Sequence, residues 1–269
     1  MEVAALSIGG ARLATDVAGE GACVVLLHAG VADRCMWRTT CEALSRKFKC
    51  IAYDRRGFGD STSPDETFRN IDDLDAVIRH FGCDGAHLIG SSQGGRIAID
   101  YALAKPKRVL SLVLVAPALS GASFPSNYPP AIQRLMDELE QSEATLDFEK
   151  MNAIEAHMWL DGPLNLENRV VGSARDLFLD MNGRALKHAP LNREQPAPSA
   201  VDQLHRLKHP AFVIWGNADF QHIKDRSRLI ANTLPGARHL VMAECAHLPN
   251  MEQPTQFDAA VLEFLTGLP

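Results

Sequence analysis

A serine flanked by small residues lies between an apolar segment and a small-residue helical pattern in the stretch AHLIGSSQGGRIA. Ser92 has Gly90 two residues before it and Gly94 two residues after it, the G-x-S-x-G pattern of a sharp strand-to-helix turn that exposes a nucleophilic hydroxyl. Glycine is required because this strained turn brings the two flanking positions against each other. Centring the pattern on Ser91 would put larger side chains at both crowded positions. Ser92 is therefore the candidate nucleophile.

A serine hydroxyl is a poor nucleophile at neutral pH, so this chemistry needs two further side chains. A histidine must take the hydroxyl proton, and a carboxylate must hold the histidine in the correct tautomer. The chain has ten histidines, so the choice among them depends on the elements that carry them.

Length and composition are those of one large globular α/β domain, alone or with an insertion. A chain of 269 residues can bury a substantial core, and 46% hydrophobic with 22% charged residues is ordinary for a soluble protein. The net charge of −6 and the lack of a basic run argue against nucleic acid as a partner. The longest apolar runs have strand length, and the N-terminus does not read as a signal peptide. We expect a cytoplasmic protein that acts on a small molecule without a membrane partner.

The cysteines and histidines show no metal-binding or redox pattern. No C-x-x-C and no H-E-x-x-H occurs, and the spacing of His205 and His209 fits a solvated helix face. We therefore expect no metal and no cofactor. The six cysteines mostly lie in apolar segments, which predicts buried, reduced thiols. They are Cys23, Cys35, Cys41, Cys50, Cys83 and Cys245.

Apolar segments of strand length alternate with amphipathic helical patterns through most of the chain. This alternation predicts an α/β fold with a mostly parallel central sheet and helices on both faces. Two glycines join the first two strands, which predicts a hairpin at the sheet edge. The predicted strands, besides the one before Ser92, are residues 3–8, 11–18, 23–27, 50–53, 109–115, 211–215 and 238–242.

The alternation stops after residue 115, at Ala-Pro-Ala, and three helical stripes follow without a strand. The stripes lie within residues 132–139, 148–158 and 170–185, and a proline-rich segment, 189–199, leads back to the core. We predict a core domain of residues 1–118 and 192–269 with a helical cap, or lid, inserted at 119–191.

Five segments, in this order, resemble α/β-hydrolases of the capped esterase and lactonase type over nearly the whole chain. They are LLHAGVADRCMW, YDRRGFGDS, GSSQGG, WGNAD and AHLPNMEQP. HAGVADRCMW and the cap segment MWLDGP also resemble relatives of 3-oxoadipate enol-lactonase. The chain departs from the family at Ala29, where a glycine usually follows the histidine. The resemblance implies the chain order serine, acid, histidine.

That order points to His247 as the base and Asp219 as the acid. His247 follows the last predicted strand in a loop of small residues, and Asp219 ends the turn GNAD after strand 211–215. The alternatives to Asp219 are Asp225, interpreted as a helix-surface residue, and Glu244, interpreted as a rim residue. A helix-capping role for Asp219 itself also remains open.

Acyl transfer also needs N–H donors for the oxyanion that develops on the substrate carbonyl. Elbow geometry predicts the backbone N–H groups of Gln93 and Gly30, with Val31 as a one-residue alternative to Gly30. We interpret His28 as ordering this loop through hydrogen bonds.

Four aromatic residues are candidates for an apolar substrate pocket, although core packing would explain each of them equally well. They are Trp37, Phe124, Trp159 and Phe220. Arg55 and Arg56, within YDRRGFGDS, are interpreted as scaffold rather than as substrate ligands.

These residues predict a cofactor-free serine hydrolase that cleaves a small or medium, largely apolar carboxylic ester or lactone through an acyl-enzyme, as a monomer or homodimer. Charges on the substrate would be left unpaired under an apolar cap. Three alternatives remain: carbon–carbon bond hydrolysis of a diketone-like substrate, perhydrolysis, and ligand sensing by a hydrolase-fold receptor with little turnover.

Overall fold

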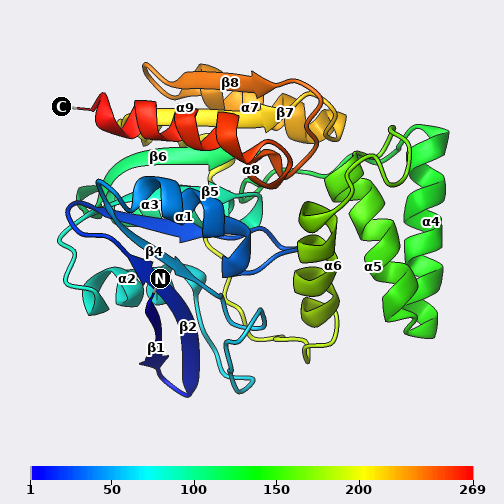
Figure 1. Cartoon of the computed structure of the whole chain (residues 1–269), viewed down its shortest axis with the longest axis horizontal. Helices are drawn as coiled ribbons and strands as arrows, with labels where there is room; N and C mark the ends of the chain where they lie inside the picture. Colours follow the sequence, from blue (N-terminus) through cyan, green and yellow to red (C-terminus); the bar gives the residue numbers. More distant parts are fainter. Residues whose placement is uncertain (1, 269) are drawn as a thin grey trace.

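The computed structural model describes residues 2–268, and within them the strands form one eight-stranded sheet with the order β1-β2-β4-β3-β5-β6-β7-β8 (Figure 1). β1 (Glu2–Ile8) and β2 (Ala11–Ala18) form an antiparallel hairpin at one edge, and β2 pairs antiparallel with β4 (Lys49–Tyr53). All other neighbours are parallel. The remaining strands are β3 (Cys23–Leu27), β5 (Ala86–Ser91), β6 (Val109–Val115), β7 (Ala211–Gly216) and β8 (Arg238–Met242). The predicted α/β class and edge hairpin are confirmed.

Both faces of the sheet are covered, which explains why the inner strands are apolar without alternation. In β3, Val25 and Leu27 belong to one core while Val24 and Leu26 belong to the other. The first core contains residues of α2 (Asn70–His80), α3 (Gln93–Ala104) and α7 (Gln221–Thr233). The second contains residues of α1 (Arg38–Leu44) and α9 (Pro254–Thr266). Four short helices lie in the connections between these elements: η1 (Arg34–Trp37), η2 (Pro106–Arg108), η4 (Val201–Arg206) and α8 (Pro249–Glu252).

Three helices between β6 and β7 lie beyond the end of the sheet toward which β7 and β8 point (Figure 1). They are α4 (Pro130–Thr145), α5 (Phe148–Ala156) and α6 (Ser173–Ala185), with a π-helical turn, η3 (His157–Asp161), directly after α5. Each predicted stripe corresponds to one of these helices, although α6 begins at Ser173 because the preceding Gly172 has a φ of 70°. The predicted core domain includes residues 1 and 269, which lie outside the described residues.

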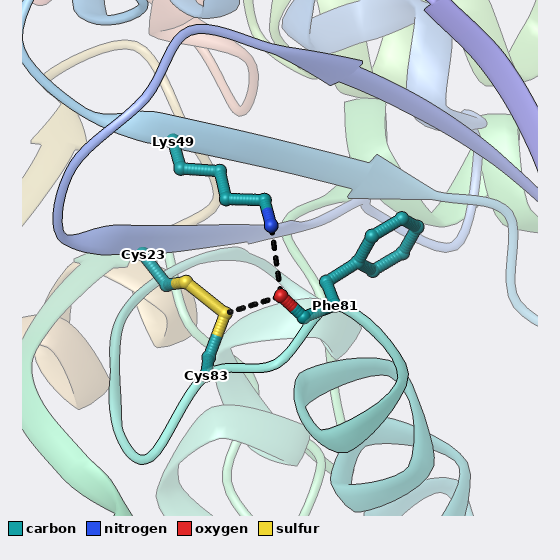
Figure 2. Close-up of a disulfide and its surroundings, with 4 residues drawn as sticks. All are labelled: Cys23, Lys49, Phe81 and Cys83. Atoms are coloured by element: carbon teal, nitrogen blue, oxygen red, sulfur yellow. Dashed lines mark hydrogen bonds between the residues drawn. A yellow bond between two sulfur atoms is a disulfide. The ribbon is translucent and has the colours of Figure 1, made fainter.

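Cys23 at the start of β3 and Cys83 after α2 form a disulfide (Figure 2), which corrects the expectation of six reduced thiols. Their Cα atoms are 6.3 Å apart, within the range that a disulfide spans. Beside the bond, the Nζ of Lys49 donates a hydrogen bond of 2.8 Å to the Phe81 carbonyl oxygen. The argument for a cytoplasmic location from reduced cysteines therefore no longer holds.

The other four cysteines are free. Burial raises the pKa of the Cys50 and Cys245 thiols to about 12, so these side chains stay protonated at neutral pH. Among residues 2–268, no helix is long and apolar enough to cross a membrane.

Candidate active site

Ser92 lies at the turn between β5 and α3, with a φ of 51° and a ψ of −113°. This positive φ is rare for a residue with a side chain and marks a strained backbone. A Cβ atom at Gly90 would lie 2.4 Å from the Gly94 carbonyl oxygen, and one at Gly94 would lie 2.2 Å from the Leu27 carbonyl oxygen. The crowding inferred from the G-x-S-x-G pattern is therefore present. Ser91, by contrast, is the last residue of β5 and is fully buried.

The loop after β8 brings His247 to Asp219, which follows β7. Nδ1 of His247 lies 2.7 Å from Oδ2 of Asp219, and both side chains are almost completely buried. The other carboxylate oxygen, Oδ1, accepts a hydrogen bond of 2.7 Å from the Phe220 N–H. Because the carboxylate accepts at Nδ1, the proton of a neutral imidazole resides there and Nε2 keeps a free lone pair. This is the tautomer that a general base requires.

The alternative carboxylates lie on the surface. Asp225 is exposed and accepts hydrogen bonds from Gln221, at 2.7 Å, and from Arg228, at 2.8 Å. Glu244 is also exposed. Neither contacts His247 among the described hydrogen bonds.

A cavity of about 290 Å³ contains both Ser92 and His247 in its wall, together with Gly30, Val31 and Gln93. These last three residues are the ones from which the oxyanion donors were predicted. Gly30 lies close to the Gln93 side chain, because a Cβ atom at Gly30 would lie 2.6 Å from Nε2 of Gln93 and would displace that amide.

Arg55 joins the two segments that were predicted to supply oxyanion donors. Its guanidinium donates to Oε1 of Gln93 at 3.1 Å and to the Ala29 carbonyl oxygen at 3.2 Å. Its backbone N–H donates to Nε2 of His28 at 3.0 Å, while Nδ1 of His28 lies 2.7 Å from the Ala29 carbonyl oxygen. Burial, reinforced by Arg55, lowers the pKa of His28 well below its ordinary value. A neutral His28 thus donates from Nδ1 and orders the loop.

Arg56 is held by carboxylates away from the cavity. It pairs with Asp73 at 2.8 Å and with Glu66 at 2.5 Å. Both arginines of this segment therefore make scaffold contacts, as the sequence indicates.

The remaining wall of the cavity is partly apolar and partly polar. Its apolar residues are Ala118, Phe124, Trp159 and Ile223, and its polar residues are Glu155, His222 and Arg226. The wall is largely apolar in area, as expected, and three ionisable side chains from α5 and α7 also face the cavity. Among residues 2–268, no group of three or more metal-binding side chains is arranged to hold a metal ion.

The four aromatic candidates lie in different places. Phe124 and Trp159 line the cavity, and the Trp159 ring centroid is 4.8 Å from that of His247. Phe220 packs behind Trp159, also at 4.8 Å, and lines a neighbouring cavity of about 380 Å³. Trp37 corrects the expectation: it is fully buried and packs against Phe257 in the core, away from the cavity.

Sequence reasoning did not place Glu155, His222 or Arg226 in the cavity. A signal for Arg226 exists, because it lies on the face of α7 that buries Ile223 and Ile230. Burial lowers the pKa of His222 to about 4, and Arg226 adds to this effect, so His222 is neutral at neutral pH. Burial raises the pKa of Glu155, against a hydrogen bond from Asn182.

Comparison with known proteins identifies the family. Residues 23–254 match the model of the alpha/beta hydrolase fold. The chain belongs to this family. This chain is 27% identical over 268 residues to a 2-hydroxy-6-oxo-6-phenylhexa-2,4-dienoate hydrolase of Burkholderia cepacia. The aligned region covers 95% of this chain and 92% of the relative. It is 26% identical over 255 residues to carboxylesterase YbfK of Bacillus subtilis, covering 91% of this chain and 80% of the relative.

Solved structures show the same fold. The enol-lactonase of Burkholderia xenovorans LB400 superimposes on this hydrolase with a TM-score of 0.73 and 23% identity, covering 98% of this chain and 100% of the lactonase. The predicted membership of the α/β-hydrolases is thereby confirmed. The relatives include a hydrolase named for a dienoate and a carboxylesterase, so the family alone does not specify the substrate.

Proposed function

We propose that this protein is a serine hydrolase that cleaves a small or medium carboxylic ester or lactone, with Ser92, His247 and Asp219 as its catalytic residues. One observation carries the proposal. The buried 2.7 Å contact between Nδ1 of His247 and Oδ2 of Asp219 leaves Nε2 available in a cavity that also contains the strained Ser92.

The reaction would proceed through an acyl-enzyme. Oγ of Ser92 attacks the substrate carbonyl carbon while its proton passes to Nε2 of His247, and Asp219 stabilises the imidazolium. The N–H groups of Gln93 and Gly30 stabilise the oxyanion. Collapse of this intermediate breaks the ester bond, and the leaving oxygen takes the proton from His247. Water then repeats the sequence and releases the acid.

The cavity supports a small or medium substrate. Its volume of about 290 Å³ lies at the lower end of the range for small-molecule pockets. Phe124 and Trp159 come from the segment between β6 and β7, so we infer that residues 119–191 act as a lid that selects the substrate. The carboxylesterase among the relatives supports the ester assignment.

Carbon–carbon bond hydrolysis of a diketone-like substrate is a second candidate. It is favoured by the likeness to the dienoate hydrolase, which extends over 95% of this chain. The same three residues would serve both reactions, so the choice requires substrates rather than variants.

The test combines a nucleophile probe with a substrate panel. A fluorophosphonate should label the wild type and not Ser92→Ala, whereas Ser91→Ala, the neighbouring matched control, should still be labelled. Removing a catalytic serine costs about 10⁶-fold in kcat in a comparable hydrolase, so Ser92→Ala should be inactive on every ester and lactone cleaved by the wild type.

The panel contains simple esters, lactones and vinylogous diketones. Turnover of esters or lactones above diketones would support the proposal, and the reverse order would favour carbon–carbon hydrolysis. Labelling without turnover of any of them would favour a receptor, and faster reaction with peroxide than with water would favour a perhydrolase.

A further inference from the structure

Four arginines are at least nine-tenths buried: Arg34, Arg55, Arg56 and Arg226. The first three have acceptors. Arg34 pairs with Asp54, Arg56 with Asp73, and Arg55 donates to Gln93 and Ala29. Among the described residues, the guanidinium of Arg226 has neither an ion pair within 4.0 Å nor a hydrogen-bond acceptor, although only 8% of the residue is exposed.

The nearby carboxylates are already engaged. Asp219 accepts from His247 and from the Phe220 N–H, and Asp225 accepts from Gln221 and Arg228. Glu155, in the same cavity, accepts a hydrogen bond of 2.6 Å from Asn182 and forms no ion pair with Arg226. The chain therefore provides no anion for this guanidinium.

A largely buried cation without an anionic partner costs free energy in the unoccupied protein, although the Phe124 ring, whose centroid lies 5.9 Å from Cζ of Arg226, offsets part of that cost. Consistent with this cost, burial lowers the pKa of Arg226, against opposing effects of Tyr128 and Asp219. An anion that enters the cavity would remove the cost and gain charge-assisted hydrogen bonds. The arrangement thus favours a ligand that brings one negative charge.

The position of Arg226 connects this charge to the reaction. Arg226 lies one turn after His222 on α7 and lines the same cavity as Ser92 and His247. His222 is neutral at neutral pH because its pKa is lowered to about 4. The guanidinium of Arg226 therefore carries the positive charge that α7 presents to this cavity. A planar guanidinium matches the two oxygens of a carboxylate.

We propose that Arg226 binds a carboxylate of the substrate, so that the ester or lactone cleaved at Ser92 is one that carries a free carboxylate elsewhere in an otherwise apolar molecule. This proposal rests on the proposed function, and it refines the substrate class that this function allows.

The kinetic test compares two esters that differ only at the end remote from the scissile bond. Monoethyl adipate ends in a carboxylate where ethyl hexanoate ends in a methyl group. The wild type should have the higher kcat/KM for monoethyl adipate, measured by pH-stat. Arg226→Met should lower kcat/KM for monoethyl adipate at least tenfold more than for ethyl hexanoate, and Arg226→Lys should restore part of the preference.

Arg228→Met is the matched control, because Arg228 lies on the same helix, is exposed and pairs with Asp225. It should leave the ratio unchanged.

A binding test works without turnover. Adipate should bind Ser92→Ala in a calorimetric titration, and adding Arg226→Met should weaken that binding at least tenfold. The Tm of ligand-free Arg226→Met should equal or exceed that of the wild type, whereas a merely structural arginine would lower it on removal. Arg226→Gln provides a second uncharged variant if Arg226→Met does not fold.

Failures of the two proposals are distinguishable. Hydrolysis of neither ester, with adipate binding that depends on Arg226, would count against the proposed function and support the carboxylate site. An ester preference that is equal in the wild type and Arg226→Met would overturn the carboxylate site while leaving the hydrolase intact. Absence of adipate binding to Ser92→Ala would also overturn it.

Discussion

At the scale of single residues, both carboxylate oxygens of Asp219 have a partner. One contacts His247 and the other accepts a hydrogen bond from the backbone N–H of Phe220. In Asp219→Asn the amide can favour the wrong imidazole tautomer, so kcat should fall by about 10⁴-fold, as for the corresponding change in a serine protease. Asp225→Asn is the matched control, six residues along the chain on the exposed face of α7, and should change kcat less than twofold. Steady-state kinetics of both variants on the best ester of the panel measures these changes in kcat. A larger loss in Asp225→Asn would mean that Asp219 is not the acid.

His222 provides a residue-scale prediction about pH and stability. Its pKa falls from 6.5 to about 4 on folding, mainly through burial and then through Arg226, while Asp219 and Asp225 oppose the shift and His247 adds to it. Between these values the unfolded chain binds a proton that the folded chain does not, so acidification destabilises the fold. Relative to His222→Gln, the wild type should lose on the order of 1 kcal/mol of unfolding free energy from pH 7 to pH 4.5, after discounting for partial exposure.

Urea unfolding at the two pH values measures this difference. His80→Gln, at an exposed position at the end of α2, is the control and should follow the wild type. A wild-type protein that gains stability on acidification relative to His222→Gln would contradict the prediction.

Local signals made part of the site predictable. Ser92 could be chosen because glycine at two fixed positions has a steric reason, and Asp219 and His247 could be chosen because each follows a recognisable strand. Trp37 could not be placed, because an aromatic residue at helical spacing fits a core and a pocket equally well. Arg226 shares its helix face with isoleucines, and only the fold shows that this face borders a cavity.

At the scale of elements, η3 joins the helical insertion to the loop that carries His247. The His247 N–H donates to the Trp159 carbonyl oxygen at 3.2 Å, and the two rings are 4.8 Å apart. The backbone contact does not need the indole, so Trp159→Ala should keep fluorophosphonate labelling of Ser92 while it enlarges the cavity. The lost apolar contact should shift the preference among acyl groups by about 1–3 kcal/mol in kcat/KM ratios.

An ester series of increasing acyl length measures this shift. Leu166→Ala is the matched control, because Leu166 is an exposed apolar residue between η3 and α6. An unchanged ranking of acyl groups in Trp159→Ala would argue against a cap that selects the substrate.

The helical and strand boundaries were predictable to within a few residues, since burial on both faces produces continuous apolar strands and burial on one face produces helical stripes. The short helices η4 and α8 were missed, because four to six residues do not establish a period. The Cys23–Cys83 disulfide also could not be predicted from the sequence pattern. The two cysteines are 60 residues apart in the sequence, and only the packing of α2 against the sheet brings them together.

At the scale of the whole molecule, the proposed catalytic residues and the disulfide lie at opposite ends of the parallel strands. Cys23 is the first residue of β3 and pairs with Ala86 at the start of β5, whereas Ser92 follows the carboxyl end of β5.

Closing a loop of this length stabilises a fold mainly through the unfolded chain, so the double variant Cys23→Ala/Cys83→Ala should lose about 2–4 kcal/mol of unfolding free energy. The rate of fluorophosphonate labelling at 25 °C should stay within twofold of the wild type, since Ser92 lies at the other end of β5 from the disulfide. Urea unfolding with and without dithiothreitol provides the internal control: reductant should destabilise the wild type and leave the double variant unchanged. Equal stability of the oxidised wild type and the double variant would contradict the prediction. A labelling rate that collapses while the double variant remains folded would instead show that the two ends of the strands are coupled.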